Sequence, residues 1–262
     1  MDAIANVPMW ALVTGLLALM TAANECGFRL GRRYHRGEPE PARAVSTALK
    51  GSVFGLVALL LGFSFSMTAS RHEARRKVVL DEANAVGTCY LRGGLLADPE
   101  RARIRDALRG YVAVRLEHFE KGLDPEEYRR TSREMDRLLA EVWAAVEAAT
   151  RKNPEAVRTS QIVPAANEVL DLSSTRAWAT RNHLPAPVLV LLVASVAVAS
   201  LLMGHSSGQA GKRHTGLWAA LNVLLVLVLF VVLDFDRPRR GLIRVDHTPL
   251  VELKASFDGP PN

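Results

Sequence analysis

Two short clusters of polar residues are the parts of this chain whose chemistry could bind an ion. The first lies within Asp81–Arg92 and the second within Asn167–His183. Glu168 and Asp171 are three residues apart, so on a helix they share one face. Calcium prefers oxygen ligands, which carboxylate and amide groups supply. The candidate residues of the two clusters are Glu82, Asn84, Arg92, Asn167, Glu168, Asp171, Arg176 and Arg181.

These clusters allow two interpretations. Glu82 could meet Arg176 or Arg181 from another helix and form a buried network that fixes a helical bundle. Alternatively, the same residues line a polar vestibule or bind a cation. The sequence has no EF-hand spacing, so we predict no dedicated metal site and no cofactor. It also has no phosphate-binding glycine loop, nucleophile elbow or zinc-protease motif, so we expect no catalytic residues and no enzyme activity.

A stripe of small residues is a third feature with functional potential. Its members follow one another at steps of three or four, which places them on one face of a helix. They are Gly51, Gly55, Ala58, Gly62, Ser66 and Ala69. Because small residues allow close helix approach, the stripe either packs inside the chain or lines a subunit interface or an ion path. Phe63 and Phe65 flank it and could narrow such a path.

Four apolar runs must position these features, and they lie near residues 7–23, 51–70, 187–203 and 217–233. Each is about long enough to cross a bilayer core, which needs ~20 helical residues. A backbone in lipid satisfies its hydrogen bonds internally, so the runs should be helices. We predict an all-α integral membrane protein, with two pairs of transmembrane helices flanking a helical extramembrane domain. The expected parts are residues 1–70, 71–186, 187–233 and 234–262.

The extramembrane part also has helical signals. No proline or glycine interrupts the chain between Gly62 and Gly87, so the second span should continue into this domain. Helix starts are expected at Asp98-Pro99, Asp124-Pro125 and Asn153-Pro154. Pro164 should kink a helix or mark a restart. The basic, Pro- and Gly-rich tail after Leu233 should end without regular structure.

Charge and cysteine content limit the possible partners. The net charge of +6 comes with basic residues beside the apolar runs, which is typical of membrane topology and anionic lipid, so we expect no nucleic acid. An even number of spans places both termini and the central domain on one side. Arg71, Arg75 and Arg76 favour the cytoplasmic side, whereas the basic first loop favours the opposite orientation. Cys26 and Cys89 lie in different segments, so no disulfide framework is expected.

Several strings in the chain resemble a known family. They are Leu60–Met67, Ser70-Arg71, Arg75-Arg76, Glu82–Thr88, Tyr90–Arg92, Asn167-Glu168 with Asp171, and His183–Pro185. Together they resemble the bacterial bestrophin-like family of membrane proteins over about residues 49–233. The resemblance implies a distant kinship with bestrophins, which are pentameric channels with four membrane helices per subunit. It implies a location in the bacterial inner membrane, with the central domain cytoplasmic.

Two functions are compatible with this sequence. The first is an oligomeric ion channel or pore, in which the second transmembrane helix lines the path of an inorganic ion. Its partners are the lipid bilayer and further copies of the chain. The alternative is a non-conducting sensor or scaffold whose helical domain binds a partner. The absence of a track of ionisable residues across the apolar runs supports this alternative.

Overall fold

The computed structural model describes residues 7–33, 40–121, 124–152, 156–237 and 241–258. Throughout these ranges the regular secondary structure is α-helical. The helices are α2 (Met9–Arg33), α3 (Glu40–Gly93), α4 (Glu100–Lys121), α5 (Pro125–Lys152), α6 (Ala156–Arg181), α7 (Ala186–Gln209), α8 (Thr215–Phe235) and α9 (Thr248–Asp258). The all-helical fold class is therefore confirmed.

Four helical segments are long and apolar enough to cross a membrane. They contain α2, the first part of α3, α7 and α8. The expectation that the second span continues beyond its apolar run is also confirmed, because α3 is one helix of 54 residues. Pro164 lies inside α6 without ending it.

The chain forms two compact units. The first comprises residues 1–71 and 183–243, and the second comprises residues 72–182 and 244–262. The predicted parts had boundaries at residues 70, 186 and 233, so the main difference lies in the tail. Residues 244–258 belong to the second unit and include α9, whose Leu250 is fully buried. The end of the tail, residues 259–262, lies outside the described residues.

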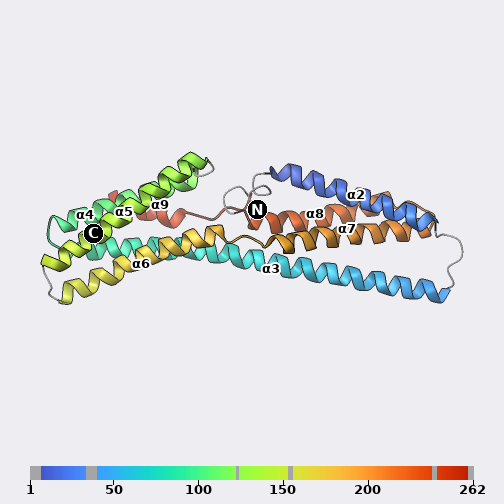
Figure 1. The fold of residues 1–262 in the computed structure, drawn as a ribbon, viewed down its shortest axis with the longest axis horizontal. Helices are drawn as coiled ribbons and strands as arrows, with labels where there is room; N and C mark the ends of the chain where they lie inside the picture. Colours follow the sequence, from blue (N-terminus) through green and yellow to red (C-terminus); the bar gives the residue numbers. More distant parts are fainter. Residues whose placement is uncertain (1–6, 34–39, 122–123, 153–155, 238–240, 259–262) are drawn as a thin grey trace. The chain divides into compact units, whose positions relative to one another are not determined.

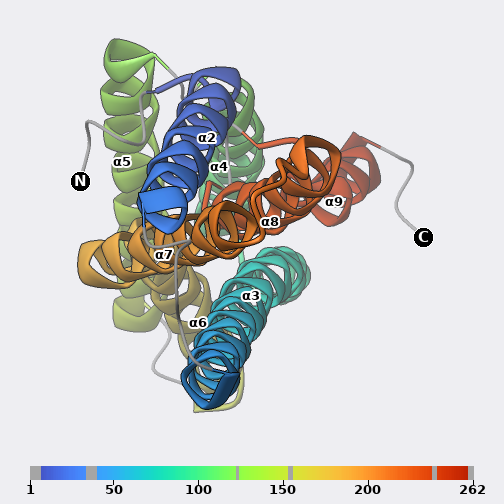
Figure 2. The same ribbon diagram turned by 90° about the vertical axis from the view of Figure 1, so that its right-hand side faces the viewer.

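In the first unit, α7 and α8 lie between α2 and the first part of α3 (Figures 1 and 2). The core between them is aliphatic and includes Met20, Val57, Leu61, Val196 and Leu229. The segments between the paired apolar runs, residues 24–50 and 204–216, are partly helical. Helix α3 already begins at Glu40. Residues 24–33 extend α2 and residues 204–209 extend α7. Both extensions are packed, as Gly27 and Gly208 illustrate.

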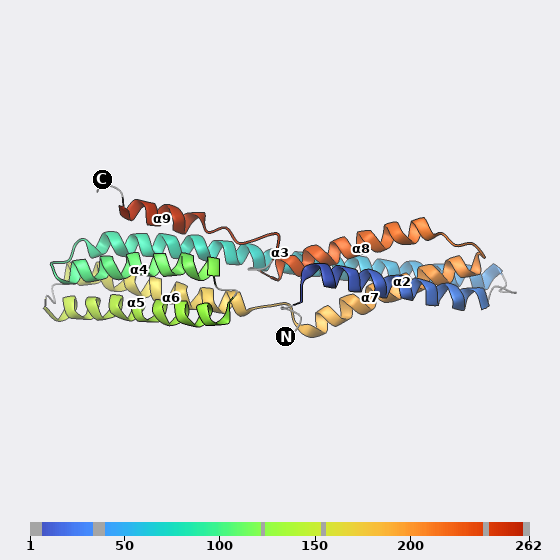
Figure 3. The ribbon, with the colours of Figure 1, turned by 90° about the horizontal axis from the view of Figure 1, so that it is seen from above.

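The second unit packs the last part of α3 with α4, α5, α6 and α9 (Figure 3). Its largest fully buried side chains include Tyr111, Ile104, Leu108 and Ile162. The expected start of α5 is confirmed, because Asp124 Oδ1 accepts a hydrogen bond from the Glu126 amide at 2.9 Å. Helix α4 begins at Glu100, directly after Asp98-Pro99. The expected start at Asn153-Pro154 lies outside the described residues, and α6 is described from Ala156.

Candidate functional site

The small-residue stripe on α3 is open in the single chain. A methyl group added at Gly51, Gly55 or Gly62 would meet no atom of another part of the chain within 4 Å. Ala58 and Ser66 are also exposed, and Ala69 is partly buried. In the single chain these glycines therefore show no close approach to another helix. The reason is the register of the buried face, which differs from that of the stripe.

The buried face of α3 is one residue out of step with the stripe. It contains Val57, Leu61, Ser64 and Thr68, all of them less than a tenth exposed. Successive residues of an α-helix are about 100° apart, so the buried face and the small stripe point in clearly different directions. Val57 and Leu61 fill the aliphatic core of the first unit. The stripe therefore lies outside the buried core of the single chain.

The two phenylalanines beside the stripe have different surroundings. Phe63 is 63% exposed. Phe65 is 43% exposed, and its ring makes an edge contact with Phe235 at a centroid distance of 5.9 Å. Phe65 is thus partly held by α8, whereas Phe63 projects from α3.

A second set of glycines, between α2 and α7, has the opposite environment. Gly27 and Gly31 face the carbonyl oxygens of Leu201 and His205 so closely that a Cβ would overlap them. Two glycines of α7 make the reciprocal contacts: Gly204 faces the carbonyl oxygen of Asn24, and Gly208 faces that of Phe28. Each helix thus offers two glycines four residues apart, the spacing that lets membrane helices touch backbone to backbone.

Polar side chains in the first unit bond across the helices beside these glycines. Asn24 Nδ2 donates to Asn222 Oδ1 at 3.1 Å. The Ser200 hydroxyl lies 3.3 Å from the same oxygen and shares its proton between that oxygen and the Val196 carbonyl oxygen at 2.9 Å. Asn24, Ser200 and Asn222 are all buried. The interhelical bonds of Asn222 join α2, α7 and α8, which is the structural role that polar residues commonly have in membrane helices.

The vestibule candidates are mostly separated in the second unit. Glu82 and Arg176 form the expected ion pair, and both side chains are buried. The other candidates do not join them. Arg92 donates from Nη1 to the carbonyl oxygen of Gln161 at 3.1 Å. The exposed candidates are Asn84, Asn167, Glu168, Asp171 and Arg181.

Glu82 is the centre of a buried network in the second unit. Its carboxylate accepts hydrogen bonds from the Tyr111 hydroxyl and from Arg176. Arg115 Nε lies 3.6 Å from Glu82 Oε1 as a second cationic partner. A fully buried carboxylate is costly unless it is paired and hydrogen-bonded, and these three partners meet that need. The structure therefore favours the interpretation of Glu82 and Arg176 as a network that fixes the bundle.

Burial changes the proton affinities of this network. Desolvation raises the pKa of the Tyr111 hydroxyl, because the buried site disfavours the phenolate. Desolvation also lowers the pKa of Arg115 to about 10. At neutral pH the tyrosine is therefore a hydrogen-bond donor and the arginine is a cation. Two guanidinium groups consequently share one carboxylate in this core.

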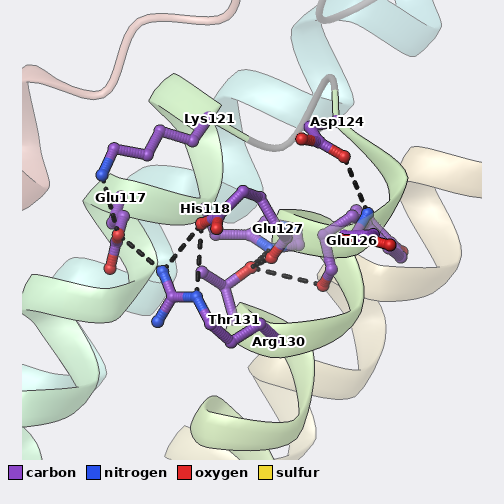
Figure 4. A network of polar contacts seen from close by, with 9 residues as sticks. Glu117, His118, Lys121, Asp124, Glu126, Glu127, Arg130 and Thr131 are labelled. Carbon is purple, nitrogen blue, oxygen red and sulfur yellow. Dashed lines mark hydrogen bonds and ion pairs between the residues drawn. The ribbon is translucent and has the colours of Figure 1, made fainter.

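A separate polar network joins α4 to α5 (Figure 4). Arg130 Nη2 donates to Glu117 at 2.6 Å and to Glu127 at 2.9 Å. The Thr131 hydroxyl donates to the carbonyl oxygen of Glu127 at 2.6 Å. The Thr131 hydroxyl has no second proton, so in its contact with His118 Nδ1, 2.6 Å away, the hydroxyl oxygen is the acceptor and the histidine is the donor. The network joins the end of α4 to the start of α5, and its side chains point toward one another (Figure 4).

Sequence reasoning missed the α2–α7 glycines, Arg115, Tyr111 and His247. The four-residue spacing of glycines within 27–31 and within 204–208 was a readable signal. The roles of Arg115 and His247 had no readable signal, because they depend on long-range contacts with α3 and α6. Among the described residues, no group of three His, Cys, Asp or Glu side chains could hold a metal ion.

One of three comparisons with known proteins gives a match. Neither curated proteins nor solved structures give a match. A family model described as "Bestrophin-like domain" matches residues 10–250, which covers most of the chain and both compact units. The chain therefore belongs to the Bestrophin-like family.

Proposed function

We propose that this protein is an oligomeric ion channel in which the open face of α3 lines the path or the interface between subunits. The observation that carries the proposal is the exposure of Gly51, Gly55 and Gly62 in the single chain. A backbone exposed at glycines lets another helix approach closely or leaves room for a narrow path. Membership of the Bestrophin-like family supports this function, because bestrophins are anion channels.

The proposed assembly is a homo-oligomer in the bacterial inner membrane. Its four spans cross in two pairs, α2 with the first part of α3 and α7 with α8, and the second unit is cytoplasmic. The arginines at the end of the α3 span, Arg71, Arg75 and Arg76, support this orientation through the positive-inside tendency. We propose that the protein conducts an inorganic ion and has no enzyme activity.

Ion flux through purified protein in liposomes tests this proposal, with chloride, potassium and sodium gradients measured separately. The decisive variant is Gly62→Leu, which adds bulk to the open face. Gly15→Leu is the matched control, because Gly15 is also exposed in a membrane helix with nothing within 4 Å. We expect selective flux that Gly62→Leu changes and Gly15→Leu preserves. No flux from folded, inserted protein would contradict the channel.

A groove along α5 favours a second candidate function, a sensor or scaffold that binds an acidic partner. Its lining residues are Glu126, Arg129, Arg130, Arg133, Glu134 and Arg137. Arg130 and Arg137 are paired with Glu127 and Glu134, whereas Arg129 and Arg133 form no ion pair with the described residues, so these two guanidinium groups are available to an acidic partner. Specific binding of an acidic protein by folded, non-conducting protein, lost when Arg129 and Arg133 are changed to Gln, would support this alternative.

A further inference from the structure

The chain after α8 returns to the second unit and is bound there at several points. Val245 and Leu250 are buried with Val79 and Ala83 of α3. The ring of Phe257 stacks on Tyr90 at a centroid distance of 4.2 Å. We call residues 244–258 the C-terminal segment.

His247 is the polar anchor of this segment, and its partners determine its protonation. Its Nδ1 lies 2.8 Å from the carbonyl oxygen of Val245, which can only accept, so Nδ1 carries a proton. Its Nε2 lies 2.8 Å from Arg176 Nη2, which can only donate, so Nε2 must be the acceptor. The ring also stacks on Phe119 at a centroid distance of 3.6 Å. The bound segment therefore requires a neutral histidine.

The charges around His247 oppose a second proton on its ring. Arg176 of α6 and Arg115 of α4 act on the ring as cations, while Asp246 of the segment itself is the favourable anion. On α3, Glu82 is already held by Arg176, Arg115 and Tyr111, and Arg76 acts on Asp246. Asp246 is exposed and also accepts from the Thr248 amide and hydroxyl. The nearest buried partner of the His247 ring is thus the Arg176 guanidinium, and a protonated ring would place a second positive charge beside it.

We propose that the C-terminal segment is a pH-dependent latch, which binds the second unit when His247 is neutral and is released when His247 is protonated. The geometry supports this because a proton on Nε2 would replace the acceptor of Arg176 with a second cation. The segment also buries Val245, Leu250 and Phe257, whose contacts do not titrate, so protonation of His247 weakens the binding of the segment through the loss of its polar anchor. The inference does not depend on whether the protein conducts ions.

The difference between the pKa of His247 in the bound and in the released segment determines how binding of the segment depends on pH. Burial first, and Arg176 second, lower the pKa of His247 from 6.5 to about 4. The released segment regains the ordinary value, so it binds protons that the bound segment does not. Binding therefore has its full strength above pH 6.5 and weakens as the pH falls toward 4. Between pH 7.5 and 5.5 the ratio of bound to released segment should fall about tenfold.

Hydrogen exchange of the full-length protein in detergent tests the latch at pH 7.5 and 5.5. Protection of the residue 248–258 peptide is normalised at each pH to the same peptide from unfolded protein. We expect its protection to fall about tenfold at pH 5.5 while the α4 peptide keeps its protection. Equal protection of the 248–258 peptide at both pH values would overturn the proposal. An equal loss in α4 would also overturn it, because that would indicate general unfolding.

Two further measurements make the result specific to His247. In His247→Gln the side-chain oxygen can accept from Arg176 but does not titrate, so the pH dependence should vanish; its persistence would refute the latch. In the control variant His118→Gln, which changes a different buried histidine of this unit, the dependence should persist. Exchange at the imidazole C2 position of wild-type protein gives the pKa of His247 directly. A value near 6.5 would refute the latch, even if both variants misfold.

Discussion

The glycines between α2 and α7 and those on the open face of α3 occur at similar helical spacing but have opposite environments. Gly27, Gly31, Gly204 and Gly208 each lie against a backbone carbonyl of the partner helix. Gly51, Gly55 and Gly62 lie against nothing in the single chain. In this chain the glycines form an intramolecular helix contact where both helices carry a pair of glycines that face each other, as α2 and α7 do.

The first unit therefore contains two kinds of glycine: those packed against the backbone of another helix and those that are exposed in the single chain. At α2–α7 the missing side chains are needed by the fold of one subunit, since the backbones occupy their volume. On α3 a side chain at Gly51, Gly55 or Gly62 would meet no other part of the single chain, and we propose that this open face serves assembly or conduction. Mutations at the two faces should therefore separate stability from function.

The largest effect is expected for Gly204→Leu at the filled interface. A side chain there overlaps the backbone of Asn24, which cannot rotate away, so α2 and α7 must separate. We expect a loss of at least about 3 kcal/mol of unfolding free energy or failure to fold. Thermal unfolding in detergent measures this loss, with Gly15→Leu as the control. A melting temperature equal to that of the wild type would show that the α2–α7 interface does not require glycine at this position.

A smaller loss is expected for Asn222→Leu. This change removes the acceptor of Asn24 and Ser200 but leaves the glycine contacts intact. Interhelical hydrogen bonds in membranes contribute roughly 0.6 kcal/mol on average and up to about 1.7 kcal/mol, so the loss should fall in that range. The same unfolding assay measures it. A loss as large as that of Gly204→Leu would mean that polar bonds, rather than backbone contact, dominate the α2–α7–α8 packing.

The smallest effect on stability is expected for Gly62→Leu. Its side chain meets no atom of the single chain, so the unfolding free energy of a detergent-solubilised monomer should change by less than about 0.5 kcal/mol. Its effect should be on assembly and flux instead. Unfolding of the monomer, compared with native mass spectrometry of the assembly, tests this separation. Severe unfolding of the monomer would show that the face is packed inside the chain after all.

Much of the fold was predictable from the sequence, because apolar runs and helix starts are local signals. The continuous α3 follows from the lack of proline and glycine after Gly62, and Asp124 caps α5 as its type suggests. The extensions of α2 and α7 were not predictable from hydropathy, since polar helix ends pack through glycines. Helix α9 was missed because a short helix in a basic tail is stabilised by tertiary contacts at Leu250 and Phe257.

The sequence identified some residues of the candidate site, but it did not show all partners of Glu82 or which face of α3 is buried. Opposite charges on two helices suggested Arg176 or Arg181 as the partner of Glu82, and the structure shows that it is Arg176. The other two partners of Glu82, Arg115 and Tyr111, come from α4, and nothing in the sequence singles them out. The stripe on α3 was recognised, but the face that packs is set by Val57 and Leu61, one residue away.

Cysteine modification on the open face tests the proposed pore most directly. In a Cys26→Ser background, where the remaining Cys89 is buried, Gly62→Cys and Gly15→Cys proteins in liposomes are treated with a charged thiol reagent during flux. The account predicts that modification reduces flux through the Gly62→Cys protein and leaves flux through the Gly15→Cys protein unchanged. Equal flux before and after complete modification at residue 62 would contradict a role of the α3 face in conduction.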